Sequence, residues 1–153
     1  SNIRYTPTTP VWGYGGGHPN WHPDGQHLIR NLQTDGKKTR FCRFRYDGTE
    51  LIVLSEKIPG GGHPSIDPAG RYIITDSFSY DGLQKVHIRL VDLVSDDEQD
   101  ICTVPTIARE NLRDSVFRLD GHPVWSRDYK KVCFNAAPDG NRQVFIADLS
   151  NVI

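Results

Sequence analysis

The chain has 153 residues, 37% of them hydrophobic, and a formal net charge of −1. This is about the length of one globular domain, and the balanced charge gives no basic surface for nucleic acid. No apolar run reaches the roughly 20 residues that a membrane-spanning helix needs, so we expect neither nucleic acid nor a membrane as a partner.

Two further properties bear on the cellular compartment. No charged segment followed by an apolar one opens the chain, so no signal peptide is visible and a cytoplasmic location is expected. The cysteines are odd in number, lie in apolar runs and lack metal-ligand spacing: Cys42, Cys102 and Cys133. We therefore predict buried free thiols, which either favour a reducing compartment or are neutral on this question.

A repeated tripeptide organises the sequence. Gly-His-Pro occurs three times, with its histidine at His18, His63 and His122. In every copy a large apolar residue follows three positions after the histidine, and an aliphatic residue ten positions after it. Thirteen positions after the histidine each copy has a short polar residue: Asn31, Asp76 and Asn135. The chain is therefore an array of similar units.

The first repeat predicts four short strands separated by turns. The segments Pro23-Asp24-Gly25, Thr34-Asp35-Gly36 and Tyr46-Asp47-Gly48 are typical turn sequences, in which glycine supplies a positive φ. The strands around these turns are expected at 19–22, 26–31, 39–45 and 50–54.

The second and third repeats follow the same plan. After the turn at 68–70, the second repeat predicts strands at 71–75, 85–93 and 101–104. The third predicts strands at 131–135 and 143–149 and stops without a fourth. Short strands with turn signals at this regular spacing predict an all-β array.

The length of the repeat indicates which array this is. His18 and His63 are 45 residues apart, whereas His63 and His122 are 59 apart, with the extra residues in a predicted long loop between Asp96 and Gly121. A four-stranded unit of about 40 to 50 residues is a β-propeller blade. We therefore predict a partial β-propeller over residues 1–153, with blades at about 17–58, 62–105 and 121–153.

Three blades cannot close a ring, because propellers have about four to eight. We expect this chain to belong to a larger propeller, in which the remaining blades cover its open strand edges; otherwise another copy of the chain covers them. Without such cover, apolar surface should be exposed around Trp21, Ile52 and Val144.

The innermost strand of a blade lines the central channel, so the three histidines should gather at one mouth of that channel. The second strands return to the same face and bring Asp76 close to them, and the predicted long loop adds amide and guanidinium groups. This mixture suits a divalent metal and an anionic ligand. In the alternative interpretation, the histidines only hydrogen-bond to backbone or to a neighbouring blade.

The aromatic residues fall into two groups. Trp21 and Trp125 occupy the core position of the repeat and should pack between blades. Trp12 and Tyr14 lie in the glycine-rich entry segment and are candidates to stack on a sugar ring.

The run His-Pro-x-Trp-x-Pro-Asp-Gly at 18–25 resembles the repeat of TolB-type β-propellers. The recurring Gly-His-Pro and the long loop between blades narrow the resemblance towards oligogalacturonate lyases and their relatives. It spans essentially the whole chain, at roughly the C-terminal portion of that family.

This resemblance implies metal-assisted β-elimination at a uronic acid of an acidic oligosaccharide. In that family a divalent metal, typically Mn²⁺, is held by histidines and a glutamine and neutralises the uronate carboxylate, while another histidine takes the C5 proton. Matched position by position, His18 would be the base, and His63 and His122 would be metal ligands. Asp120, a possible further ligand, stands where the family has a histidine, and residues 115–119 contain no glutamine.

The resemblance also calls for a cationic contact to the substrate carboxylate, for which Arg113 and Arg118 are the candidates. The other substrate-binding candidates at the same mouth are Asn111, Trp12, Tyr14 and Asp76. The alternative is a non-catalytic propeller that binds a protein or a glycan there.

Overall fold

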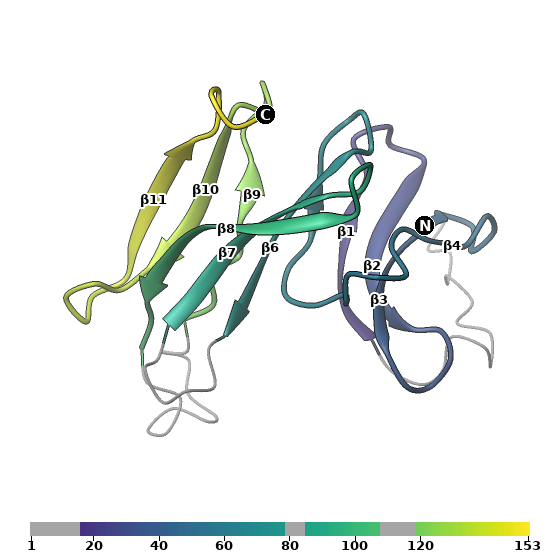
Figure 1. The fold of residues 1–153 in the computed structure, drawn as a ribbon, viewed down its shortest axis with the longest axis horizontal. Helices are drawn as coiled ribbons and strands as arrows, with labels where there is room; N and C mark the ends of the chain where they lie inside the picture. The colour runs from purple at the N-terminus through teal and green to yellow at the C-terminus, as the bar shows by residue number, and fades with distance from the viewer. Residues whose placement is uncertain (1–15, 79–84, 108–118) are drawn as a thin grey trace, which may run out of the picture.

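In the computed structural model, residues 16–78, 85–107 and 119–153 are described, and they form three antiparallel sheets without a helix. Figure 1 shows the sheets side by side in chain order, with the second between the other two. The described residues accordingly include no helix that could cross a bilayer. The prediction of an all-β, partial propeller is confirmed.

Each sheet is ordered as its strands follow in the chain. The first contains β1 (Gly16–Trp21), β2 (His27–Gln33), β3 (Thr39–Arg45) and β4 (Ile52–Val53). The second contains β5 (Ser65–Ile66), β6 (Tyr72–Phe78), β7 (Lys85–Asp92) and β8 (Asp97–Pro105). The third contains β9 (Val124–Trp125), β10 (Lys131–Ala136) and β11 (Gln143–Asp148). This meander of neighbours is the strand order of a propeller blade.

The predicted Asp-Gly turns form as expected. After β1, the Asp24 carboxylate accepts hydrogen bonds from the backbone N–H groups of Gln26 and His27, at 2.8 and 2.9 Å. Gly25 then reverses the chain with a φ of 67°, which residues with a Cβ adopt only at a cost.

The outer strand of the second blade begins earlier than predicted. A strand was expected only at 101–104, but β8 begins at Asp97. Polar residues 97–100 look like a loop in sequence, yet an edge strand faces solvent and tolerates charge. They are also matched to β7, where Glu98 pairs with Arg89 and Asp100 lies 2.6 Å from His87 Nδ1.

The core lies between the sheets. On β6, Ile73 packs in the cluster shared with the first sheet, while its neighbour Ile74 packs in the cluster shared with the third. Successive strand residues point to opposite faces, so a strand covered on both sides is apolar on both. The middle blade is therefore buried between the other two.

Several large apolar side chains of the first and third blades are exposed among the described residues. Trp21 is 57% exposed, Ile52 42%, and Val144 67%, so the predicted exposure at these three residues is confirmed. Trp125 is 8% exposed, and its Nε1 donates to the Ser65 carbonyl of the middle blade at 3.1 Å. The predicted packing between blades is confirmed for Trp125, whereas no described sheet covers Trp21.

All three cysteines are free thiols, as predicted. Cys42 is buried, and this burial raises the pKa of its thiol to about 11. Cys102 and Cys133 are only partly buried.

Candidate functional site

The Gly-His-Pro tripeptides place their histidines at the start of the inner strands, and their backbone has positive φ values there. In the first blade the β1–β2 pairing is irregular between Gly17 and Asn20, and His18 has a φ of 55°. His122 has a φ of 44°, whereas in the second blade the preceding Gly62 has the positive φ, 62°. Positive φ is uncommon outside glycine and often marks functional sites.

The three histidine rings lie against one another, one from each blade. The His63 ring is in the middle, with its centroid 4.0 Å from that of His18 in an edge-on arrangement and 3.5 Å from that of His122 in a stacked one. With the neighbouring prolines they line a hollow of about 380 Å³. The prediction that the three histidines gather in one place is confirmed.

Asp76 lies beneath this stack and is buried, with 1% of its surface exposed. Its carboxylate is 2.9 and 3.0 Å from His63 Nδ1 and accepts the backbone N–H groups of His63 at 2.8 Å and of His122 at 2.9 Å. Burial alone would raise the pKa of Asp76, but the bonds from the two histidine residues outweigh it and hold that pKa below its ordinary value. Asp76 was predicted as a substrate-binding residue, and the structure shows its carboxylate bonded to His63 and His122.

The same repeat position holds the loops together in the other two blades. Asn31 Nδ2 donates to the Gly62 carbonyl of the next blade at 2.8 Å, and Asn135 Nδ2 donates to the Asp120 carbonyl at 3.3 Å. Asn20, which no repeat pattern singled out, adds a bond from its Nδ2 to the Pro64 carbonyl at 3.2 Å.

A possible metal site combines two of the histidines with Asp120. His63, His122 and Asp120 each offer one ligand atom, and these atoms lie within 4.8 Å of one another. Asp120 Oδ2 is 3.9 Å from His122 Nε2. The side chains of His63 and Asp120 are 11% and 12% exposed, whereas that of His122 is 56% exposed. Two imidazoles and a carboxylate are a donor set that suits Zn²⁺, Mn²⁺ or Fe²⁺.

His18 lies beside this site on the first blade. Burial, followed by the nearby His63, lowers the pKa of the His18 imidazole below 6.5. The lowered pKa favours the uncharged ring, which is able to accept a proton.

Five predicted substrate-binding residues lie outside the described residues: Trp12, Tyr14, Asn111, Arg113 and Arg118. The three histidines, Asp76 and Asp120 are the predicted site residues that the structure brings together.

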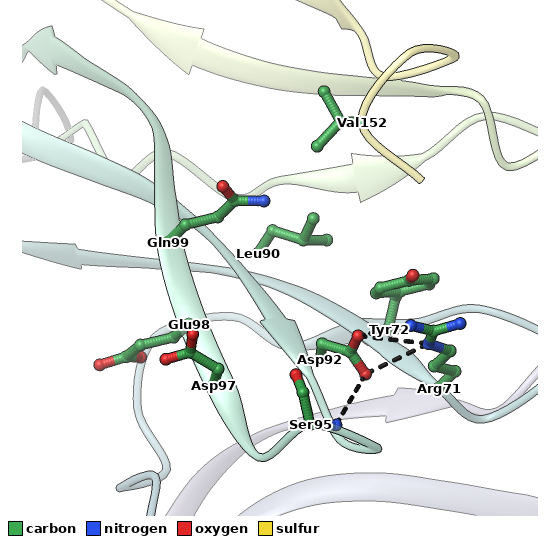
Figure 2. Close-up of a pocket in the computed structure, with 9 residues that line it drawn as sticks. All are labelled: Arg71, Tyr72, Leu90, Asp92, Ser95, Asp97, Glu98, Gln99 and Val152. Carbon is green, nitrogen blue, oxygen red and sulfur yellow. Dashed lines mark hydrogen bonds and ion pairs between the residues drawn. The ribbon is translucent and has the colours of Figure 1, made fainter.

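A second pocket lies at the opposite end of the middle blade. Figure 2 shows this hollow of about 310 Å³, in which Arg71 and Asp92 face each other beside Tyr72. Arg71 Nη2 donates to Asp92 Oδ2 at 2.7 Å, and this bond lowers the pKa of Asp92 to about 2. The Arg71 guanidinium also lies over the Tyr72 ring, 4.6 Å from its centroid. These side chains interact with each other, far along the blade from the histidines.

The chain is similar in structure to part of several solved β-propellers. TolB from Acinetobacter baumannii matches with a TM-score of 0.65 and 19% identity, over 90% of this chain and 30% of that one. An oligogalacturonate lyase from Vibrio parahaemolyticus matches with a TM-score of 0.71 and 17% identity, over 97% of this chain and 39% of that one. An oligogalacturonate lyase in complex with manganese matches with a TM-score of 0.65 and 17% identity, over 88% and 35%.

These similarities establish the class of fold. The chain is part of a β-propeller, and it spans about a third of the length of the three propellers above. No protein-family model and no curated protein matches its sequence.

Proposed function

We propose that the full-length protein is a metal-assisted lyase that cleaves uronate-containing oligosaccharides by β-elimination. The observation that carries this proposal is the grouping of His63, His122 and Asp120 around one point, with a neutral imidazole at His18 beside them. The manganese complex of a lyase that is similar in structure supports it.

The residues present fit a divalent cation such as Mn²⁺. His63 and His122 would each give a ring nitrogen and Asp120 a carboxylate oxygen, leaving further coordination positions for water or substrate. Bound there, the cation would neutralise the uronate carboxylate and so make the neighbouring C–H more acidic.

His18 would act as the general base. Its imidazole takes the proton from C5 of the uronate, the electron pair of that C–H bond forms the C4–C5 double bond, and the glycosidic C4–O bond breaks. The departing oxygen then takes a proton from water, and the protonated His18 returns its proton to solvent. A base with a pKa below 6.5 stays unprotonated at neutral pH, although it is a weaker base for that reason.

The assay is direct. Full-length protein is incubated with oligogalacturonate and Mn²⁺, and the absorbance of the unsaturated product is followed. We expect product from the wild type, none from H18A with metal binding retained, and neither product nor tight metal binding from H63A. A blank result over a panel of uronates, together with a blank metal analysis, would remove the proposal.

One observation favours a second candidate, a non-catalytic propeller that holds a peptide or a glycan at the same mouth. The three imidazoles contact one another directly, as they would if they only joined the blades. In that case H63A lowers stability or has no effect, and no metal is lost because none was bound. Substitution of His63 therefore separates the two functions.

A further inference from the structure

We infer that Asp76 is a positioning residue that fixes which nitrogen of His63 faces the metal and holds His122 in place beside it. This inference rests on the proposed function, in which His63 and His122 are metal ligands. Asp76 itself reaches neither metal nor substrate in this account. It acts through the two histidines from beneath.

The contacts of the His63 ring determine which of its nitrogens carries the proton. Both oxygens of Asp76 lie within 3.0 Å of Nδ1 of His63. An ionised carboxylate only accepts hydrogen bonds, so Nδ1 must carry the proton. In the neutral imidazole the other nitrogen, Nε2, then has the lone pair that a metal needs. Histidine ligands of metals commonly donate their second N–H to a carboxylate in this way.

The Asp76 carboxylate also links two blades. The same carboxylate accepts the backbone N–H of His63, on its own blade, and that of His122, which lies 46 residues after Asp76 in the chain. These bonds fix the two loops relative to each other, which sets the 3.5 Å stacking of the two rings. One buried group thus determines the spacing of both proposed histidine ligands.

The glycines of the two tripeptides leave room for Asp76. A Cβ at Gly62 would lie 1.8 Å from the Asp76 carbonyl oxygen and 2.4 Å from its Oδ1. A Cβ at Gly121 would lie 3.1 Å from Oδ2 and 2.9 Å from side-chain atoms of Val86 and Ile88. By contrast, a Cβ at Gly17 would meet nothing within 4 Å. The first blade has Asn31 at the repeat position that Asp76 occupies in the second. Among the three tripeptide glycines, the two tight ones belong to the loops that Asp76 joins.

The other blades indicate how to test this role without breaking the fold. Asn31 and Asn135 occupy the same position of the repeat and donate to loop carbonyls, so asparagine suits this backbone. D76N therefore keeps the size of the side chain and removes the charge that holds the proton on His63 Nδ1. N31A is the matched control, because the hydrogen bond that it removes goes to the Gly62 carbonyl and not to an imidazole.

The experiment has two readouts on the full-length protein. Without metal, ¹⁵N chemical shifts of the histidine rings report which nitrogen of His63 is protonated. We expect the Nδ1–H form in the wild type and in N31A, and a mixture or the Nε2–H form in D76N. Calorimetric titration with Mn²⁺ alone should give at least about tenfold weaker binding for D76N, as for other groups behind metal ligands, and a change below about twofold for N31A.

An Nε2–H form of His63 in the wild type, or unchanged ring shifts in D76N, would overturn the role of Asp76. Equal Mn²⁺ affinity of D76N and wild type would overturn it as well. If the wild type binds no Mn²⁺ but has the expected ring form, the metal-dependent function fails while the effect of Asp76 on His63 stands. The two failures are therefore distinguishable.

Discussion

Two histidine–aspartate pairs of similar geometry do different work in this molecule. His63 and Asp76 are 13 positions apart in sequence and join the loops of two blades. His27 and Asp24 are three positions apart, with 2.7 Å between Nδ1 and Oδ2, and lie within a single turn. Side-chain exposure is 11% and 1% in the first pair and 16% and 35% in the second.

The surroundings account for the difference. Asp24 also accepts N–H groups of its own turn, and its partner His27 has a second carboxylate, Glu50, 3.2 Å from Nε2. Asp24 also has a second histidine, since His22 Nδ1 lies 3.1 Å from its Oδ2, but His22 belongs to the same turn. The second histidine residue at Asp76, His122, is on another blade. The arrangement around Asp24 stabilises a turn, whereas the arrangement around Asp76 organises a cluster of imidazoles. A histidine–aspartate pair therefore becomes a candidate site through the groups that surround it, more than through the distance between its own two side chains.

The largest expected effect is loss of the Asp76 carboxylate. D76A leaves His63 Nδ1 and two backbone N–H groups without their acceptor in a buried place, which should cost about 3 kcal/mol or more of unfolding free energy. The partly exposed D24A should cost about 1 kcal/mol. Urea denaturation of the full-length variants measures both, and equal losses would remove the distinction between the two pairs.

A smaller contrast is expected between two glycines. Gly62 and Gly25 have nearly the same φ, 62° and 67°, but only at Gly62 would a Cβ meet the Asp76 backbone. G25A should cost about 1 kcal/mol, the usual penalty of a left-handed residue. G62A should cost at least about 1 kcal/mol more, because the contact with Asp76 must move. Thermal unfolding of both variants decides this, and a G62A protein as stable as G25A contradicts the close fit around Asp76.

The smallest expected effect depends on pH and concerns His27. Its hydrogen bonds to Asp24, and next to Glu50, raise the pKa of His27 above 6.5. A raised folded-state pKa contributes stability that is fully present below pH 6.5 and is lost as the pH rises through the folded value. H27Q should thus be less stable than wild type at pH 5.5, by less than about 1 kcal/mol, with a smaller difference at pH 9. A difference that grows with pH would contradict this sign.

Much of the architecture could be predicted from sequence because the repeat carries it. Turn glycines, alternating apolar residues and the recurring tripeptide act locally and repeat, so they identify blades and bring His18, His63 and His122 together. The start of β8 was missed because acidic side chains within residues 97–100 pair with side chains of β7. The composition of one strand does not reveal pairs with its neighbour. Trp21 and Trp125 share a repeat position but differ in exposure, 57% against 8%, because exposure depends on which blades surround each residue.

The role of Asp76 shows a different limit. The repeat alignment placed it near the histidines, but it gave no sign that the carboxylate is turned inward and shared between two loops. The one sequence signal for this role is that the second blade has an aspartate at a repeat position where the other two blades have asparagine, Asn31 and Asn135. Which oxygen accepts which N–H depends on how the two blades pack, and the sequence of either segment alone does not determine that packing.

The most direct test of the account is to locate Mn²⁺ in crystals of the full-length protein by its anomalous scattering. The account predicts one strong peak bounded by the ring nitrogens of His63 and His122 and the carboxylate of Asp120, with His18 beside it and without a direct bond. A peak elsewhere, or none at these three residues at millimolar Mn²⁺, would contradict it.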